Sequence, residues 1–594
     1  MQDENALREV AKDCVHCGFC LPACPTYQLW AEEMDSPRGR IYLVNQILDG
    51  AELSAAARVH FDRCLGCMAC MTACPSGVQY DQLIEAARVW TEHGTVQPAV
   101  ASQAPGGADE GVAEVRGADA GSPAGQSTAS VPAPPVPAAG RRSARERAER
   151  AAIFALFPYP RRLRAATAPL RLAQRAGLDR ALARSGLPGR LSPALGAALR
   201  LGASGAGRLG ASGAGRPAPP RAAAAGRLPE RVPARGPRRA VVAMLTGCVQ
   251  SVLFPGVNAA TARVLAAEGC DVIIPRGQGC CGALSLHSGR EAEAAAFGRR
   301  AIATFEQAAV DAIVVNSAGC GSAMKEYERL LSAPGGEWAP RAAAVSGKVR
   351  DLAEFLAELG PAAPRHPLPV TAAYHDACHL AHAQRITAAP RELLAAIPDL
   401  DLVELPDAGT CCGSAGVYNL LQPEAAAELG GRKADAVIAA GAPLVISANP
   451  GCSLQIAAAV AGRGAQVAVA HTAEILDASI RGRGWPTPPG AGEEGPAVLP
   501  RVAVLTARSA SVSRRACWGS CGSRAWEPRT AWPPCSRTRR CSPRTRRRAP
   551  STMRSTTRAR TCATSRRWRW RGCRRSRLPS PPLRPPRRRW SGPP

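Results

Sequence analysis

Short apolar runs alternate with longer helical stretches between residues 240 and 480. The runs are rich in β-branched residues, as in AVVAML at 240–245 and LVIS at 444–447, and such runs are typical of buried strands. Stretches rich in Ala and Leu, with helical periodicity, separate them. This order predicts α/β modules in which helices connect parallel strands.

The cysteines of this region repeat along the chain at near-constant offsets of 130 to 132 residues. The flanking runs repeat with them, since DVIIP at 271–275 corresponds to LVELP at 402–406. Such a repeat indicates a duplicated structural unit. We predict two modules, at 239–360 and 361–482, with the cysteines at the strand ends, where open α/β sheets place their sites. The first set is Cys248, Cys280, Cys281 and Cys320, and the second is Cys378, Cys411, Cys412 and Cys452.

Helical signals also occur before residue 200. In SPRGRIYLVNQIL, at 36–48, four apolar residues fall on one helical face, which predicts packing against a core. Arg, Ala and Leu recur with helical spacing over 143–200, which we interpret as a helical connector. The four apolar residues are Ile41, Val44, Ile47 and Leu48.

The cysteines near the N-terminus form two copies of one motif. CVHCGFCLPACP at 14–25 and CLGCMACMTACP at 64–75 both read C-x2-C-x2-C-x3-C-P, the spacing of ferredoxins with two 4Fe-4S clusters, in which the fourth cysteine binds the other cluster. We predict such a domain over 1–92. The expected ligands are Cys14, Cys17, Cys20 and Cys74 for one cluster, and Cys64, Cys67, Cys70 and Cys24 for the other.

Zinc and disulfides are the alternatives for these cysteines. Zinc ligands usually come as two separated pairs, whereas each run here has three evenly spaced cysteines and one offset. The N-terminal MQDENALREV lacks the basic and apolar layout of a secretory signal, so we expect a cytosolic, reducing setting. Iron-sulfur clusters are therefore favoured.

Each repeated module contains a vicinal cysteine pair followed by glycine. Adjacent cysteines do not easily form a relaxed disulfide with each other, but they can present two thiolates to one metal centre. Gly282 and Gly413 would allow a turn or a close approach that a Cβ would block. Two alternatives stay open: buried, inert cysteines and a redox thiol pair without metal.

Histidines and cationic residues lie near the module cysteines. For the histidines, a structural role is about as plausible as metal ligation or proton handling. The cationic residues could bind an anion or dock a partner, although solvent-facing positions without a specific role are favoured. The histidines are His287, His375, His379 and His382, and the cationic residues are Lys325, Arg385 and Lys433.

Three segments lack the composition of a packed core. Residues 93–142 and 201–238 consist mainly of Ala, Gly, Pro, Ser and Arg, and 483–594 is rich in Arg and Pro. Such segments cannot offset the entropy of ordering. We therefore expect an α and α/β multidomain chain: a helical two-cluster ferredoxin domain, then two duplicated α/β modules, with disordered linkers and tail.

The net charge of +28 is concentrated in the tail. Residues 501–594 hold 27 arginines and one acidic residue, Glu527, so that residues 1–500 carry only +2. The body of the protein is thus no basic nucleic-acid binder, and we expect no nucleic-acid partner. Two hypotheses remain for the tail: an out-of-frame or unselected extension, and a disordered segment that binds nucleic acid or anionic membrane.

Several other signals are missing from the sequence. It has no G-x-G-x-x-G after a strand and no G-x-S-x-G, and its best apolar run, at 241–254, is broken by Thr, Gly and Gln. We therefore expect a chain that carries electrons without a flavin or nicotinamide site of its own, and that does not span a membrane.

These motifs together resemble the iron-sulfur subunit family of glycolate oxidase (glycolate dehydrogenase). The resemblance rests on CVHCGFCLPACPTYQ, GCCGALSLHSG, NSAGCGSAMKEYE, YHDACHLAH, CCGSAGVYNLLQPE and ANPGCSLQI, and it covers 1–92 and 240–480. FPYPRRLR also fits the family's helical connector. Similar domain pairs occur in lactate-utilisation proteins, in anaerobic glycerol-3-phosphate dehydrogenase and in heterodisulfide reductase.

The resemblance implies a subunit rather than a complete enzyme. Partner subunits containing FAD would oxidise glycolate to glyoxylate, and this chain would relay electrons through two 4Fe-4S clusters toward a quinone-linked membrane acceptor. The implied location is cytoplasmic and peripheral, on the inner face of the cytoplasmic membrane. A further iron-sulfur or metal centre in the modules is a possibility that the resemblance leaves open.

One departure concerns the modules. Heterodisulfide reductase modules end in C-x2-C, whereas this chain has CGSA at 320–323 and CSLQ at 452–455. The last cysteine is missing from both copies. This argues against heterodisulfide chemistry, although a thiol/disulfide redox enzyme stays an alternative, as does a subunit of a lactate or glycerol-3-phosphate dehydrogenase.

Overall fold

The N-terminal part of the chain is helical, as predicted. The computed structural model describes residues 4–94, 142–175, 196, 198–199, 201, 228–332 and 336–485. The apolar face predicted over 36–48 lies on helix α3, where all four of its residues are buried. Ser36 caps this helix by accepting a hydrogen bond from the Gly39 amide. The elements are α1 (Glu4–Lys12), α2 (Pro25–Trp30), η1 (Glu33–Asp35), α3 (Pro37–Leu48), α4 (Ala55–Arg63), α5 (Ala69–Ala73) and α6 (Tyr80–His93).

Two helices follow in the connector. They are α7 (Ala144–Leu156) and α8 (Pro160–Arg175), and a capping box between Ser143 and Glu146 starts the first of them. Phe154 of α7 packs into one apolar cluster with Val417 and Leu420 of the second module.

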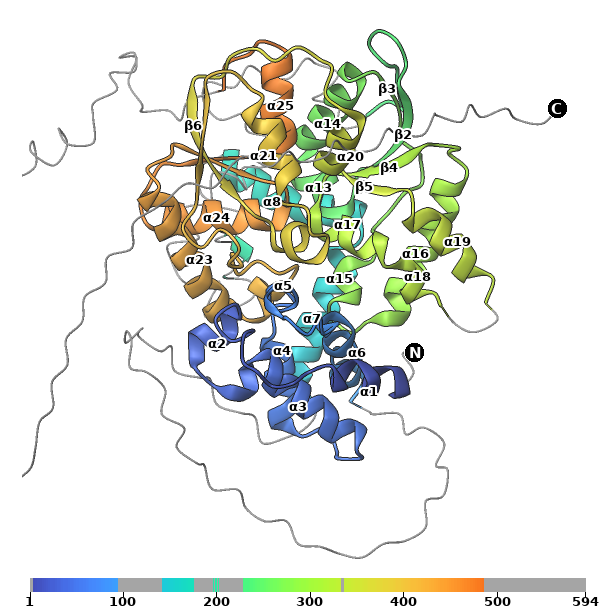
Figure 1. Cartoon of the computed structure of the whole chain (residues 1–594), viewed down its shortest axis with the longest axis vertical. Helices are drawn as coiled ribbons and strands as arrows, with labels where there is room; N and C mark the ends of the chain where they lie inside the picture. The colour runs from blue at the N-terminus through green and yellow to red at the C-terminus, as the bar shows by residue number, and fades with distance from the viewer. Residues whose placement is uncertain are drawn as a thin grey trace, which may run out of the picture. The chain divides into compact units, whose positions relative to one another are not determined.

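The first module is a five-stranded sheet in the order β1-β3-β2-β4-β5, shown in green in Figure 1. All of its pairs are parallel except β1 with β3. Its strands are β1 (Arg231–Val232), β2 (Ala240–Leu245), β3 (Cys270–Ile273), β4 (Ala312–Val315) and β5 (Val349–Asp351). Its helices are α13 (Cys248–Leu253), α14 (Pro255–Ala267), α15 (Ala283–Leu286), α16 (Glu291–Glu306), α17 (Ala318–Lys325), α18 (Tyr327–Leu330), α19 (Trp338–Ser346) and α20 (Leu352–Leu359).

The second module repeats this sheet as β7-β6-β8-β9, with every pair parallel (yellow to orange in Figure 1). The order matches β3-β2-β4-β5, so the duplication predicted from the cysteines is confirmed in the topology. The strands are β6 (Val370–His375), β7 (Leu400–Glu404), β8 (Leu444–Ser447) and β9 (Ala468–Ala470). The helices are η3 (His379–Ala383, a π-helix), α21 (Ala388–Ala395), α22 (Tyr418–Leu421), α23 (Pro423–Ala439), α24 (Pro450–Gly462) and α25 (Thr472–Ile480).

The two sheets share one hydrophobic core. Val242 of β2 and Tyr374 of β6 belong to the same buried cluster, while Ala243 and Ala373, the neighbours that point to the opposite faces, belong to two separate clusters. Each sheet is therefore buried on both faces, which explains why its strands are continuously apolar.

The fold class predicted from the sequence is confirmed. The linkers predicted at 93–142 and 201–238 and the tail predicted at 483–594 lie mostly outside the described residues, and the individual domain boundaries stay a prediction. Within the part of the chain that the structure describes, no helix combines the length and the apolar content needed to cross a bilayer.

Candidate metal and electron-transfer sites

The eight cysteines of the N-terminal motifs lie in the loops and short helices between α1 and α6. The turns that hold them need unusual backbone conformations, since His16, Gly18, Gly66 and Met68 all have positive φ. A cavity is lined by all four cysteines predicted for the first cluster and by Cys70, which is predicted for the other cluster. Those four are Cys14, Cys17, Cys20 and Cys74.

The fourth cysteine of each motif lies near the other motif. Cys74 is close enough to Cys14 for its charge to raise the pKa of that thiol. In the same way Cys24 acts on Cys67 and Cys70. The chain thus brings together the donors of the crossed arrangement, although cluster binding by these residues stays a prediction. Soft thiolates of this number and spacing suit iron-sulfur clusters.

The thiols of the second motif are buried. Burial, reinforced by neighbouring thiols, raises the pKa of Cys67 and Cys70 well above its ordinary value. Burial opposes ionisation of Cys64, but the charges of Arg40 and Arg88, together with hydrogen bonds from the Gly66 amide and the Tyr80 hydroxyl, lower the pKa of that thiol. A thiolate is the ligand form of cysteine, so these two arginines favour metal binding there. No local sequence pattern identifies these two arginines, because packing of distant segments buries them.

The two motifs differ in their access to solvent. Cys17 is exposed, and its neighbours Val15 and Phe19 are 69% and 66% exposed. Cys67 is buried together with Cys378 and Cys411 in a single apolar cluster. The first motif therefore faces solvent, and the second faces module 2.

Two polar contacts hold the second motif and the residue before it against module 2. Thr72 Oγ1 and His382 Nδ1 are 2.8 Å apart, and the Tyr418 hydroxyl donates to the Arg63 carbonyl at 3.1 Å. These bonds join residues more than 300 positions apart in the chain.

All eight module cysteines lie at the carboxyl ends of the parallel strands, as predicted. One cysteine of each module follows β2 or β6, and the vicinal pair lies in the loop after β3 or β7. The last lies in the first turn of α17 or α24, the helix that follows β4 or β8. In chain order these are Cys248, Cys280, Cys281 and Cys320 in module 1, and Cys378, Cys411, Cys412 and Cys452 in module 2.

The four thiols of each module form a row in which each contacts the next. In module 1 the Sγ atoms of Cys248 and Cys280 are 3.5 Å apart, and hydrogen bonding between neighbouring thiols, together with burial, raises the pKa of Cys280 and Cys281. Cys378 shows the same effect beside Cys411. All the cysteines that the structure describes are free, so no disulfide closes these rows.

The glycines after the vicinal pairs behave as predicted. Gly282 and Gly413 have φ of +89° and +84°. A Cβ on them would lie 2.9 Å from the Ala294 carbonyl oxygen and 2.8 Å from the Ala426 carbonyl oxygen, respectively. The close approach of a helix backbone is thus the reason for glycine in both modules.

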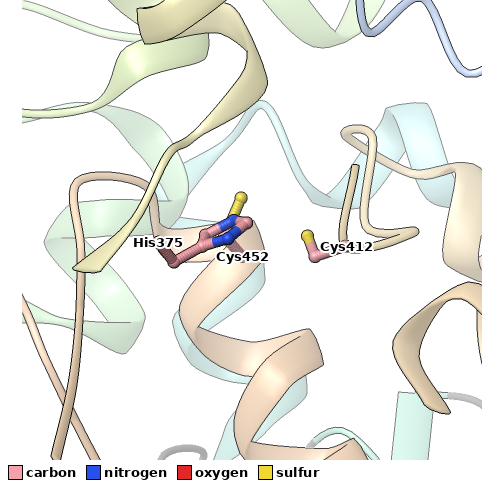
Figure 2. Close-up of side chains that lie close together, drawn as sticks. All are labelled: His375, Cys412 and Cys452. Carbon is pink, nitrogen blue, oxygen red and sulfur yellow. The ribbon is translucent and has the colours of Figure 1, made fainter. Parts of the chain in front are cut away.

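The candidate histidines have four different environments. His375 is fully buried beside Cys412 and Cys452, and the three side chains face one small space (Figure 2). The Nδ1 atom of His379 is 3.5 Å from Cys378 Sγ. His287 lies against Glu85, at 3.3 Å, and His382 joins Thr72 to the Gly409 carbonyl.

The three cationic candidates also lie in different environments. Lys325 pairs with Glu354 at 2.7 Å, and Arg385 is exposed, with a positive φ. Lys433 corrects the expectation of a solvent-facing side chain, because it is 3% exposed and donates to the Asp407 carbonyl at 2.8 Å. Burial lowers the pKa of Lys433, and the nearby Cys412 opposes that shift.

Family models match most of the described chain. A 4Fe-4S dicluster domain matches 10–78, the linker region of the glycolate oxidase iron-sulfur subunit matches 145–201, and a cysteine-rich domain matches both 242–325 and 372–457. The probable glycolate oxidase iron-sulfur subunit of Bacillus subtilis (strain 168) is 34% identical over 473 residues, which are 78% of this chain and 93% of that protein. The chain belongs to the glycolate oxidase iron-sulfur subunit family.

Other relatives support the same assignment. The glycolate oxidase iron-sulfur subunit of Escherichia coli (strain K12) is 31% identical over 488 residues, 81% of this chain and 97% of that protein. The lactate utilization protein A of Exiguobacterium sp. is 32% identical over 241 residues, 98% of its own length but 40% of this chain. The chain is thus an iron-sulfur electron-transfer subunit of an oxidoreductase.

Proposed function

We propose that this subunit carries electrons from an FAD-containing partner, which oxidises glycolate to glyoxylate, toward a quinone-linked acceptor in the membrane. The substrate and the partner are suggested by the relatives of matching length, whose names specify glycolate oxidase. The location that follows is cytoplasmic, on the inner face of the cytoplasmic membrane.

The position of Cys67 beside Cys378 is the observation that supports a relay within one chain. The eight cysteines of the N-terminal motifs would hold two 4Fe-4S clusters, which exchange single electrons when bound. Burial of Cys67 and Cys378 excludes water from the contact between the second motif and module 2. The exposed loop around Cys17 offers a partner access to the first motif.

The test is copurification of the subunit with its flavoprotein, followed by an iron count and assays with glycolate, D-lactate and glycerol 3-phosphate. We expect about eight iron atoms from the two clusters, and reduction of the clusters by glycolate only when the flavoprotein is present. Oxidation of glycolate by the subunit without the flavoprotein would contradict the relay. If D-lactate or glycerol 3-phosphate reduced the clusters and glycolate did not, the proposed substrate would be wrong.

Two cysteine variants make the iron count specific. Cys17→Ala should lower the iron content and remove the signal of one reduced cluster, because it deletes a predicted ligand. Cys270→Ala is the matched control, since Cys270 is a free cysteine buried in the core on strand β3, away from both motifs. It should keep its iron. An unchanged iron count in Cys17→Ala would contradict the assignment of that ligand.

A further inference from the structure

The second module contains a compact group of metal-ligating side chains. One ligand atom each from His375, Cys412 and Cys452 lies within 4.8 Å of the other two, and among the described residues no other three His, Cys, Asp or Glu side chains gather so closely. His375 ends strand β6, Cys412 lies in the loop after β7, and Cys452 lies in the first turn of α24 (Figure 2).

The imidazole of His375 has no hydrogen-bond partner. The side chain is completely buried, yet neither Nδ1 nor Nε2 is bonded to any protein atom. The hydroxyls of Ser414 and Ser447, on the loop and the strand next to it, are also buried without a partner. A buried polar group without a partner destabilises the folded protein, so these groups point to a ligand at this place.

The corresponding positions in the first module are apolar. At the offsets of the duplication, Leu245 takes the place of His375, Ala283 that of Ser414, and Val315 that of Ser447. Leu245 packs with Cys281 in one hydrophobic cluster. The two modules therefore share a row of thiols, but at these three positions only module 2 has polar side chains.

Charge also distinguishes module 2. Lys433 is buried near Cys412 and Cys452, whereas the matching turn of helix α16 carries the apolar Ala301 and Ile302. Hydrogen bonding is similar in the two modules, since the Asn449 amide donates to Cys452 Sγ at 3.4 Å and Ser317 bonds to Cys320 at the matching position. The positive charge of Lys433 favours the thiolate form of the cysteines in module 2, which is the form that binds metal.

We propose that His375, Cys412 and Cys452 bind a thiophilic metal ion in module 2, with the imidazole as a nitrogen ligand that module 1 lacks. One imidazole and two thiolates suit Zn²⁺ or an iron atom. Binding displaces the two thiol protons to solvent, so the two thiolate charges balance a divalent ion. This site is independent of the substrate of the partner subunit.

The test is the metal content of the anaerobically purified full chain, with zinc and iron counted separately. His375→Leu introduces the residue that module 1 has at this position. We expect the loss of about one zinc ion per chain, or of the iron of one centre, while the iron of the N-terminal motifs stays. His375→Cys should restore the metal, because a thiolate replaces the imidazole as donor.

A second histidine and a wild-type measurement complete the design. His366→Leu is the control, since His366 is exposed in the same module, and its metal content should equal that of the wild type. If His375→Leu contains as much zinc and as much iron as the wild type, the proposal is overturned. If that variant does not fold, X-ray absorption at the zinc and iron edges of the wild type decides, because the absence of an imidazole ligand at both metals would overturn it too.

Discussion

At the scale of single residues, two buried histidines of module 2 have contrasting environments. The ring of His471 is fully bonded: Nδ1 accepts from the Ala473 amide at 3.0 Å, and Nε2 lies 2.8 Å from the Asn316 carbonyl. These partners hold a neutral imidazole, which caps helix α25 and bonds to module 1. His375 has neither bond, and burial lowers the pKa of both rings, to about 4 for His471 and about 3 for His375. Burial alone therefore does not distinguish a structural histidine from a ligand, whereas the hydrogen-bond partners do.

We predict that His471 makes the protein less stable in acid. The unfolded chain binds a proton near pH 6.5 and the folded chain only near pH 4, so the free energy of unfolding falls as the pH drops through this window. The loss between pH 7.5 and 5.5 should be about 1 kcal/mol. Urea unfolding at several pH values measures this loss in the wild type and in His471→Asn, which keeps a capping side chain. The contribution of His471 is the difference between the two proteins in the slope of the free energy of unfolding against pH.

Two buried carboxyl groups change the free energy of unfolding with pH in the opposite direction, but they do not affect the comparison of the wild type with His471→Asn. Burial raises the pKa of Asp351 and of Glu326 to about 7, so their contribution to stability is lost as the pH rises toward 7. They are present in both proteins and cancel in the difference. Identical pH slopes for the wild type and His471→Asn would contradict the prediction.

At the scale of elements, the loop with the vicinal cysteines depends on one glycine. Gly413→Ala should lower the free energy of unfolding by at least about 2 kcal/mol, because a positive φ disfavours a side chain and the Cβ would clash with the Ala426 carbonyl. The displaced loop should also weaken metal retention. Thermal unfolding and metal analysis measure both effects.

Gly441→Ala separates strain from packing. Gly441 also has a positive φ, +67°, but a Cβ there would meet nothing within 4 Å. This variant should cost only about 1 kcal/mol and should keep its metal. Equal effects of the two substitutions would show that the close approach of helix α23 to Gly413 does not matter.

At the scale of the whole molecule, Glu85 joins the helical domain to module 1. It accepts from Arg329 at 2.8 Å and faces His287. Burial opposes its ionisation, but these two partners lower the pKa of Glu85 to about 2. We predict that Glu85→Gln lowers the free energy of unfolding by about 3 kcal/mol, because it leaves buried charge less well paired. Hydrogen exchange in α6 should become faster.

An exposed ion pair provides the control. Asp435 pairs with Arg463 at 2.8 Å, with side chains 60% and 45% exposed. Asp435→Asn should change the free energy of unfolding by less than about 1 kcal/mol, and exchange in α6 should stay as in the wild type. Equal effects of the two variants would contradict a special role for Glu85 at this contact.

Local sequence by itself determined the chemistry and the repeat. Ligand spacing within each N-terminal motif, the offsets of the duplicated cysteines and the strand-sized apolar runs are all properties of the linear chain. A comparison of MLTGC at 244–248 with YHDAC at 374–378 also places His375 against Leu245. That difference is the one sequence signal that could have singled out His375.

Tertiary structure alone decided which of these groups meet. Three features join segments far apart in the chain: the burial of Cys67 and Cys378 in one cluster, the burial of Lys433, and the approach of His375 to Cys412 and Cys452. Packing of helices and sheets brings such segments together, and no short-range pattern in one sequence records those distances. The physical reason is that ligand type and spacing are local properties, whereas burial and proximity depend on the whole fold.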